Sequence, residues 1–261
     1  MAPLIDTHAH LDEAGFDTDR DDVLSRARAA GVVSIVSIAT TADSSAATLA
    51  LAARYPMLRA SVGIHPNHCG AALPGDWDRI IELAKDPSVV ALGETGLDRH
   101  WDYTPWEIQL DYFARHLALS RELALPVVIH SRDCDAEIME TLRQDHVRGP
   151  LNGVMHSFTG CADMAAECLK LGLYISFAGM VTFKKSDSLR AVAAGISSER
   201  ILVETDSPYL SPHPLRGKRN EPSHVIHTAA CLAQIRGESP EAFARQTTAN
   251  AQRLFAIGAD D

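Results

Sequence analysis

The chain alternates short apolar, β-branched runs with longer stretches in which Ala, Leu, Arg and Glu recur at helical spacing. This alternation is typical of βα units, whose strands lie parallel in one sheet. About eight such units within 261 residues predict a TIM (β/α)8 barrel. A doubly wound sheet uses the same units and is the alternative. The predicted strands are Pro3–His8, Val32–Ile38, Leu58–Gly63, Val89–Glu94, Pro126–His130, Gly153–His156, Leu173–Phe177 and Ile201–Glu204.

The composition narrows the class of protein. Hydrophobic residues make up 46% of the chain and charged residues 22%, as in ordinary globular proteins. No apolar run approaches the ~20 residues of a membrane helix, and no basic stretch precedes an apolar one near the start. The five cysteines form no CxxC pair, which fits a reducing compartment. We therefore expect a cytoplasmic protein with no membrane span, and a single domain over residues 1–261 because no linker interrupts the pattern.

The net charge of −10 bears on possible partners. Binding of duplex nucleic acid over a broad surface needs many Lys and Arg residues on one face, and an acidic chain is poorly suited to it. Bound divalent cations would reverse the local potential, so a phosphodiester substrate remains compatible with this charge.

Polar residues follow several of the predicted strands at the carboxyl end, where α/β folds place their active sites. Strands this far apart in order do not converge in an open sheet, whereas a closed barrel brings their ends around one mouth. The polar residues therefore favour the barrel. They are His8, His10, Glu94, His130, His156 and Asp206.

These residue types point to metal chemistry. Strand alternation places Asp6, His8 and His10 on one side, so two imidazoles can reach one ion. A lone HxH pattern is more often incidental, and a buried, hydrogen-bonded histidine is the alternative for each residue. Four imidazoles and two carboxylates exceed the needs of one ion and favour two ions bridged by a carboxylate and a hydroxide. Such ligands suit Zn, Mn, Fe or Co better than Mg.

The chain resembles the TatD-type metal-dependent deoxyribonucleases, within the amidohydrolase superfamily of barrels. The resemblance extends over nearly the whole chain, as far as Arg219–Pro222. The motifs that carry it are Leu4–Asp12, Gly63–Pro66, Gly93–Asp98, Pro126–Asp133, His156–Gly160 and Glu204–Tyr209.

The resemblance implies a two-metal site. His8, His10 and Asp206 would bind one ion, His130 and His156 the other, and Glu94 would bridge them. It further implies hydrolysis of DNA phosphodiesters, commonly from a 3′ end and on single strands. The family is described as magnesium-dependent, and the metal is expected to be Mg, Mn or Zn. Glu94, Asp206 and His65 are the predicted catalytic residues.

Substrate contacts are predicted around this centre. His65 matches a family position near the substrate phosphate, as a phosphate contact or general acid; a hydrogen-bonded histidine in the barrel mouth is the alternative. Arg132 is expected to pair with a phosphate or, alternatively, with Asp133 or Asp135. Basic residues near the mouth would form a positive rim, or an ordinary solvated loop: Arg216, Lys218, Arg219, Lys184 and Lys185.

Three aromatic residues, Trp101, Tyr103 and Trp106, offer a stacking surface for an unpaired base, although packing is the commoner role of aromatic residues that open a helix. The run Arg99–Trp101 departs from the family pattern, in which aromatic residues directly follow Asp98.

Two other functions compete. An amidohydrolase would cleave a lactone, a cyclic amide or an ester, including an aminoacyl ester on tRNA. Such barrels often bridge their metals through a carbamylated lysine, but here Glu94 occupies that place and Lys85 precedes the strand. A scaffold with a structural metal is the non-enzymatic alternative. The sequence predicts no oligomeric state.

Overall fold

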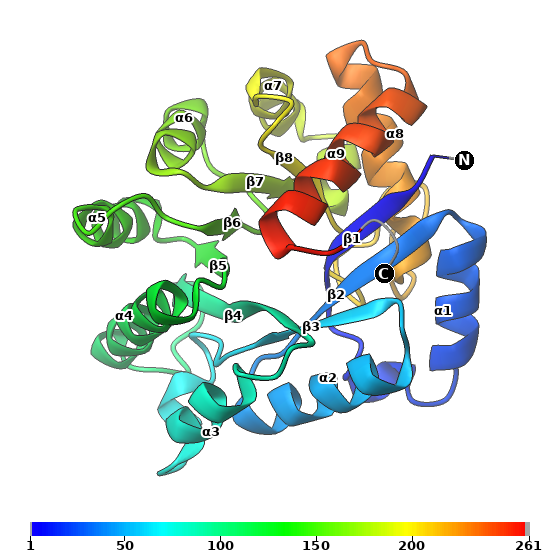
Figure 1. The fold of residues 1–261 in the computed structure, drawn as a ribbon. Helices are drawn as coiled ribbons and strands as arrows, with labels where there is room; N and C mark the ends of the chain where they lie inside the picture. The colour runs from blue at the N-terminus through cyan, green and yellow to red at the C-terminus, as the bar shows by residue number, and fades with distance from the viewer. Residues whose placement is uncertain (1, 259–261) are drawn as a thin grey trace.

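Eight parallel strands form one sheet in chain order in the computed structural model, which describes residues 2–258 (Figure 1). The sheet closes where Ala9 pairs with Ser207, and the amide of Asp206 donates to the carbonyl of His8 at 2.9 Å. This closure confirms the predicted barrel and excludes the doubly wound sheet. The strands are β1 (Leu4–Ala9), β2 (Val32–Ile38), β3 (Leu58–Val62), β4 (Val89–Asp98), β5 (Val127–Arg132), β6 (Gly153–Met155), β7 (Tyr174–Phe177) and β8 (Ile201–Val203).

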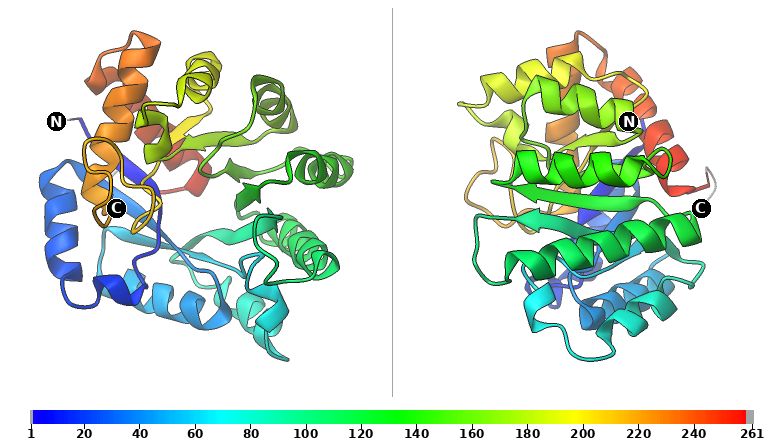
Figure 2. Two further views of the ribbon diagram at one scale, coloured as in Figure 1. Left: turned by 180° about the vertical axis from the view of Figure 1, so that it is seen from behind. Right: turned by 90° about the vertical axis from the view of Figure 1, so that its left-hand side faces the viewer.

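Helices surround the barrel, as the two further views show (Figure 2). Side-chain caps start two of them: Thr41 accepts from Ser44 N ahead of α2, and Ser239 accepts from Ala242 N ahead of α9. The α-helices are α1 (Arg20–Ala29), α2 (Ala42–Arg54), α3 (Asp76–Leu83), α4 (Trp106–Leu123), α5 (Asp135–His146), α6 (Ala162–Leu171), α7 (Asp187–Gly195), α8 (Val225–Arg236) and α9 (Pro240–Phe255). The 3-10 helices are η1 (Ala14–Phe16), η2 (Cys69–Ala71), η3 (Gly179–Thr182) and η4 (Pro222–His224). Among the described residues, no helix is both long and apolar enough to cross a bilayer.

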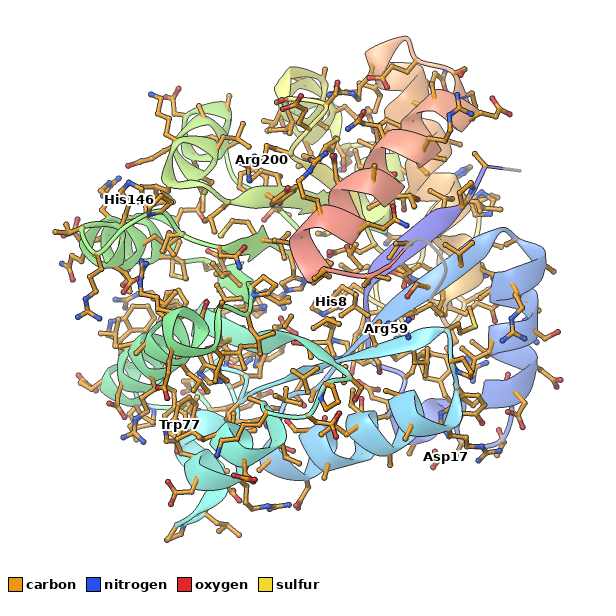
Figure 3. The ribbon with its side chains drawn as sticks, viewed as in Figure 1. His8, Asp17, Arg59, Trp77, His146 and Arg200 are labelled. Atoms are coloured by element: carbon orange, nitrogen blue, oxygen red, sulfur yellow. The ribbon has the colours of Figure 1, made fainter. Side chains whose placement is uncertain are left out.

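The barrel has a closed end and an open end. Helix α9 covers the amino ends of the strands: Thr248 donates to the carbonyl of Pro3, and Asn250 donates to the carbonyl of Ile201. Phe255 of α9 belongs to a buried apolar cluster with side chains of several strands, Val128 among them. The polar residues at the carboxyl ends therefore face the opposite mouth. Figure 3 shows His8 near the barrel centre and Trp77 and His146 among the outer helices.

Strand β4 is the largest departure from the sequence prediction. It was expected to end at Glu94, but it continues to Asp98 and pairs with β5 along this extension. Glycine makes the extension possible, because Gly96 has a φ of +138° and a Cβ there would collide with the carbonyl oxygen of His130. Glu94 therefore lies inside a long strand and not at its end.

A buried neutral histidine supports the end of β3. His116 of α4 is fully buried; its Nδ1 donates to the Tyr112 carbonyl at 2.7 Å and its Nε2 accepts from the Ile64 amide at 3.1 Å. Both contacts require the uncharged imidazole. Burial accordingly lowers the pKa of His116 to about 4.

Acid should therefore destabilise the protein through His116. Between pH 6.5 and about 4 the unfolded chain binds a proton that the folded chain excludes, so the free energy of unfolding falls as the pH falls. A pKa lowered from 6.5 to about 4 corresponds to about 3 kcal/mol. Urea unfolding at pH 7 and pH 4.5 should show a smaller acid loss for His116→Gln than for the wild type. The exposed His213→Gln is the control; equal acid losses in all three proteins would contradict the assignment.

Candidate metal centre

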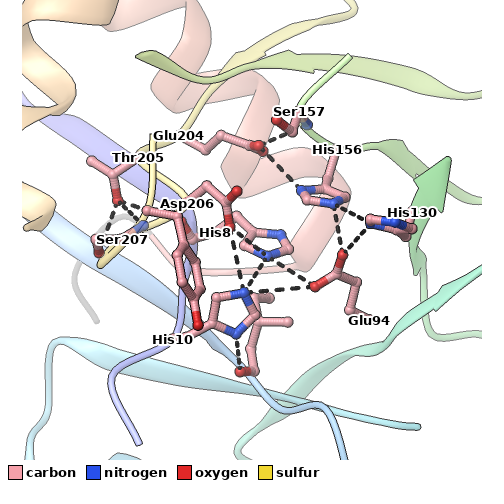
Figure 4. Close-up of polar contacts among 12 residues, drawn as sticks. His8, His10, Glu94, His130, His156, Ser157, Glu204, Thr205, Asp206 and Ser207 are labelled. Atoms are coloured by element: carbon pink, nitrogen blue, oxygen red, sulfur yellow. Dashed lines mark hydrogen bonds and ion pairs between the residues drawn. The ribbon is translucent and has the colours of Figure 1, made fainter. Parts of the chain in front are cut away.

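Six side chains from five strands converge at the open mouth (Figure 4). His8 belongs to β1 and His10 follows it, Glu94 lies within β4, and the other three come from the ends of β5, β6 and β8. All six are buried or nearly so. These are the residues predicted from the sequence: His8, His10, Glu94, His130, His156 and Asp206.

One group of donor atoms surrounds Glu94 Oε2. It lies 3.4 Å from His8 Nε2 and 3.6 Å from His10 Nε2. The two imidazole nitrogens are 3.2 Å apart, and Asp206 Oδ1 lies 3.6 Å from His8 Nε2 and 3.4 Å from His10 Nε2. Ligands at roughly 2.0–2.2 Å from a tetrahedral ion are separated by about 3.3–3.6 Å. These distances have the spacing of ligands around one cation, with His8, His10 and Asp206 as a group of donors.

A second group surrounds the other oxygen of the same carboxylate. Glu94 Oε1 lies 2.8 Å from His130 Nδ1 and 2.7 Å from His156 Nε2, and these two nitrogens are 3.3 Å apart. His65 Nε2 is also near, at 3.5 Å. Glu94 thus presents one oxygen to each group.

The hydrogen bonds on the far side of three imidazoles indicate which nitrogen is free to bind an ion. His10 Nδ1 faces the carbonyl of Ile38 at 3.0 Å, and a carbonyl oxygen only accepts, so Nδ1 carries the proton. His130 Nε2 faces Asp98 Oδ2 at 3.1 Å in the same way. His156 Nδ1 faces Glu204 Oε1 at 3.3 Å.

Each of these rings consequently aims an unprotonated nitrogen at Glu94 whenever it is neutral. A lone pair facing a carboxylate oxygen is repulsive unless a proton or a cation lies between them. Carboxylate or carbonyl groups behind metal-binding imidazoles are typical of metal sites. The donor set fits bound cations.

The pKa shifts of Glu94 and His10 also agree with a site for positive charge. Burial opposes ionisation of Glu94, but the imidazoles of His156, His65 and His130 outweigh burial and hold the pKa of its carboxyl well below its usual range. Burial likewise disfavours charged His10, but its bond to Asp206 and the charge of Glu94 raise the pKa of His10 to about 9. The carboxylates thus favour positive charge at this centre, as a proton or as a cation.

Asp98 and Glu204 orient imidazoles and were given no role by the sequence analysis. In the sequence, both residues stand out only as members of motifs, Gly93–Asp98 and Glu204–Tyr209. Glu204 Oε1 also accepts from the amide of Ser157 at 2.7 Å. The sequence did offer one signal for these two residues. A carboxylate at the end of an apolar strand is expected to be buried, and a buried carboxylate needs a partner.

The predicted substrate contacts lie in different parts of the structure. His65 is close to Glu94, and Arg132 is exposed at the end of β5. Arg216 and Lys218 lie exposed on the segment after Asp206, with the Arg216 guanidinium carbon 3.7 Å from the Phe183 ring centroid.

Two expected contacts are engaged elsewhere. Arg219 forms an ion pair with Asp19 at 2.6 Å, which removes it from a free positive rim. Trp106 packs against the core beneath the Arg99 guanidinium, so packing is its role.

Replacing Asp98 with asparagine should weaken metal binding. The carboxylate holds His130 Nε2 and accepts from Asn67 Nδ2 at 3.0 Å, and an amide would present one acceptor oxygen instead of two. Loss of such a partner lowers metal affinity about 10- to 100-fold. Metal titration by calorimetry checks this, with the exposed Asp111→Asn as control; equal affinities of Asp98→Asn and wild type would contradict the role.

Comparisons with known proteins agree with the fold and the site. A family model described as TatD related DNase matches residues 5–256. An uncharacterized metal-dependent hydrolase, YabD of Bacillus subtilis, is 41% identical over 97% of this chain and 99% of its own length. The 3′-5′ ssDNA/RNA exonuclease TatD of Klebsiella pneumoniae is 36% identical over 97% of this chain and 98% of its own length. The crystal structure of YJJV, a TatD homolog from Escherichia coli, has a TM-score of 0.92 at 31% identity, with 98% of each chain covered.

A β/α barrel with this donor set at its carboxyl mouth is a metal-dependent hydrolase. More closely, the chain belongs to the family of TatD related DNases.

Proposed function

We propose that this protein hydrolyses phosphodiester bonds of single-stranded DNA from the 3′ end, with two divalent cations held on either side of Glu94. The division of one carboxylate between two donor groups carries the proposal, because a single ion would need only one of them. His8, His10 and Asp206 would hold one cation, His130 and His156 the other, and Glu94 both. The exonuclease named among its relatives supports this substrate class.

Two cations there would lower the pKa of water and neutralise charge on a phosphoryl group. The chain itself supplies the other roles. His65 Nδ1 accepts from the amide of Asn67 at 3.1 Å, so its proton is on Nε2, which points toward Glu94. Burial lowers the pKa of His65 to about 4, so a neutral N–H is available to a phosphate oxygen. We assign His65 the phosphate contact rather than the general acid. Asp206, whose side chain is 13% exposed, would accept the proton of the attacking water.

A substrate panel tests this function. The metal-loaded protein is assayed with 3′- and 5′-labelled single-stranded DNA, the matching RNA, a phosphodiester chromogen, a set of lactones and an aminoacyl-tRNA. Stepwise shortening of DNA from the 3′ end is expected, with little lactone turnover. Hydrolysis of lactones or aminoacyl esters without cleavage of DNA would overturn the proposal in favour of the amidohydrolase alternative.

A further inference from the structure

The loop that joins β4 to α4 carries two exposed aromatic rings beside the metal centre. Trp101 and Tyr103 are 43% and 63% exposed, and their rings stack with centroids 5.3 Å apart and planes 8° from parallel. Large aromatic side chains are usually buried for their apolar area. This pair instead forms a flat apolar face in solvent.

The loop is held in place at several points, so the rings are presented on an ordered segment. Gln109 of α4 accepts from the Asp98 amide at 2.9 Å and donates to the carbonyls of Asp98 and Thr104, both at 3.1 Å. Thr104 Oγ1 accepts from the Gly70 amide at 3.1 Å. Hydrogen bonds of the buried Asp98, Thr104 and Gln109 thus fix both ends of the loop without burying the two rings.

Asp98 connects this loop directly to the metal centre. Its Oδ1 accepts from the amides of His100 and Trp101, at 2.8 and 3.2 Å, while its Oδ2 holds the imidazole of His130. The stacked rings therefore begin three residues from a carboxylate that orients a candidate ligand. Their place next to the reaction centre follows from this shared side chain.

Arg132 lies on the same side, with its guanidinium carbon 5.9 Å from the Trp101 ring centroid. Two acidic side chains of this region have other partners: Asp133 pairs with His100 at 2.9 Å, and Glu137 pairs with Arg99 at 2.9 Å. Within residues 2–258, Arg132 forms no ion pair. An exposed guanidinium beside an aromatic pair matches a phosphate next to a base.

We propose that Trp101, Tyr103 and Arg132 form a nucleotide subsite, in which an unpaired base of the substrate stacks on the rings and Arg132 binds a backbone phosphate. This proposal rests on the proposed function and deepens it. Only a base that has left its duplex partner and stack can lie flat on the rings, so the subsite selects single strands.

Removing the base from the substrate, or the two rings from the protein, should raise KM by a similar factor. When the last three 3′ nucleotides of an oligothymidylate are abasic, we expect KM of the wild type to rise about tenfold. This rise corresponds to ~1.4 kcal/mol, which is in the range measured for base stacking on aromatic residues. Trp101→Ala/Tyr103→Ala should show a similar rise on the normal oligonucleotide and less than about twofold further loss on the abasic one.

The variants separate the subsite from other effects. Tyr103→Ala alone keeps the test available if the double variant misfolds, and Trp101→Phe, which retains a ring, should lose less than Trp101→Ala. Val147→Ala, at an 88% exposed apolar side chain following α5, is the control. Arg132→Gln should raise KM on both substrates and reduce the slope of log KM against log salt by about 1.

The outcomes are distinct. An equal abasic penalty in the wild type and in the ring variants would overturn the subsite while leaving the nuclease function intact. Failure of the wild type to cleave any oligonucleotide would overturn the proposed function, and with it the subsite.

Discussion

Glu94→Gln should lower kcat on single-stranded DNA by at least about 10³-fold, equivalent to ~4 kcal/mol of transition-state stabilisation. Glutamine keeps the shape of the side chain but replaces one oxygen by an NH2 group and removes the charge. Glu94 presents its two oxygens to separate donor groups, at 3.4 Å from His8 Nε2 and 2.7 Å from His156 Nε2. One neutral oxygen cannot serve both groups. The bound metal should therefore fall from two ions per chain to one or none.

Kinetics at saturating metal and elemental analysis of the purified protein measure these two effects. Glu82→Gln removes an acidic side chain that is 75% exposed on α3 and serves as the matched control. Circular dichroism and thermal melting identify loss of fold, and Asp206→Asn provides an independent variant on one side of the site. Full activity of Glu94→Gln together with two bound metals would refute the assignment of the bridge.

Removal of metal by chelation should abolish activity, and added divalent metal should restore it. Four imidazoles contribute to the site, so Mn, Co or Zn should restore activity at lower concentration than Mg, which prefers oxygen ligands. Chelation should also lower the melting temperature, because a ligand at about 100 times its Kd stabilises the folded state by about 2.7 kcal/mol. For a chain of this size, that corresponds to a shift of roughly 5–10 °C.

The chelation experiment needs a metal-saturated chelator as its control, so that direct effects of the chelator are excluded. Turnover is measured on end-labelled single-stranded DNA, and melting by differential scanning calorimetry. Demetallated protein that digests the oligonucleotide at its normal rate would contradict the metal assignment.

Much of the fold was predictable because the signals were local. Each predicted strand overlaps an observed one, and β2 runs over Val32–Ile38 as predicted. The extension of β4 was missed because glycine is typical both of loops and of strands in close contact. Gly96 has no room for a side chain beside β5, and this crowding depends on a strand that follows some 30 residues later.

The residues of the candidate site were predictable from the sequence to about the same extent as the fold. Apart from Glu94, which lies inside β4, the proposed ligands stand at or near the carboxyl ends of apolar strands, and barrel closure brings all six side chains together. Arg219 pairs with Asp19 instead of standing free at the rim, a contact that only the folded chain defines, whereas Trp106 packs beneath Arg99, which is the commoner role stated for it. Neighbours in the folded chain decide whether a surface cation or an aromatic ring is free to contact a substrate.

The sequence by itself determined the order of strands and helices and the kinds of side chain at the strand ends, because periodicity and hydrophobicity act over a few neighbouring residues. Only the tertiary structure decided how those side chains are used. Which nitrogen of each imidazole faces Glu94 depends on partners far along the chain: Ile38 for His10, Asp98 for His130 and Glu204 for His156. A hydrogen bond acts over about 3 Å, and the folded barrel alone brings these groups within that distance.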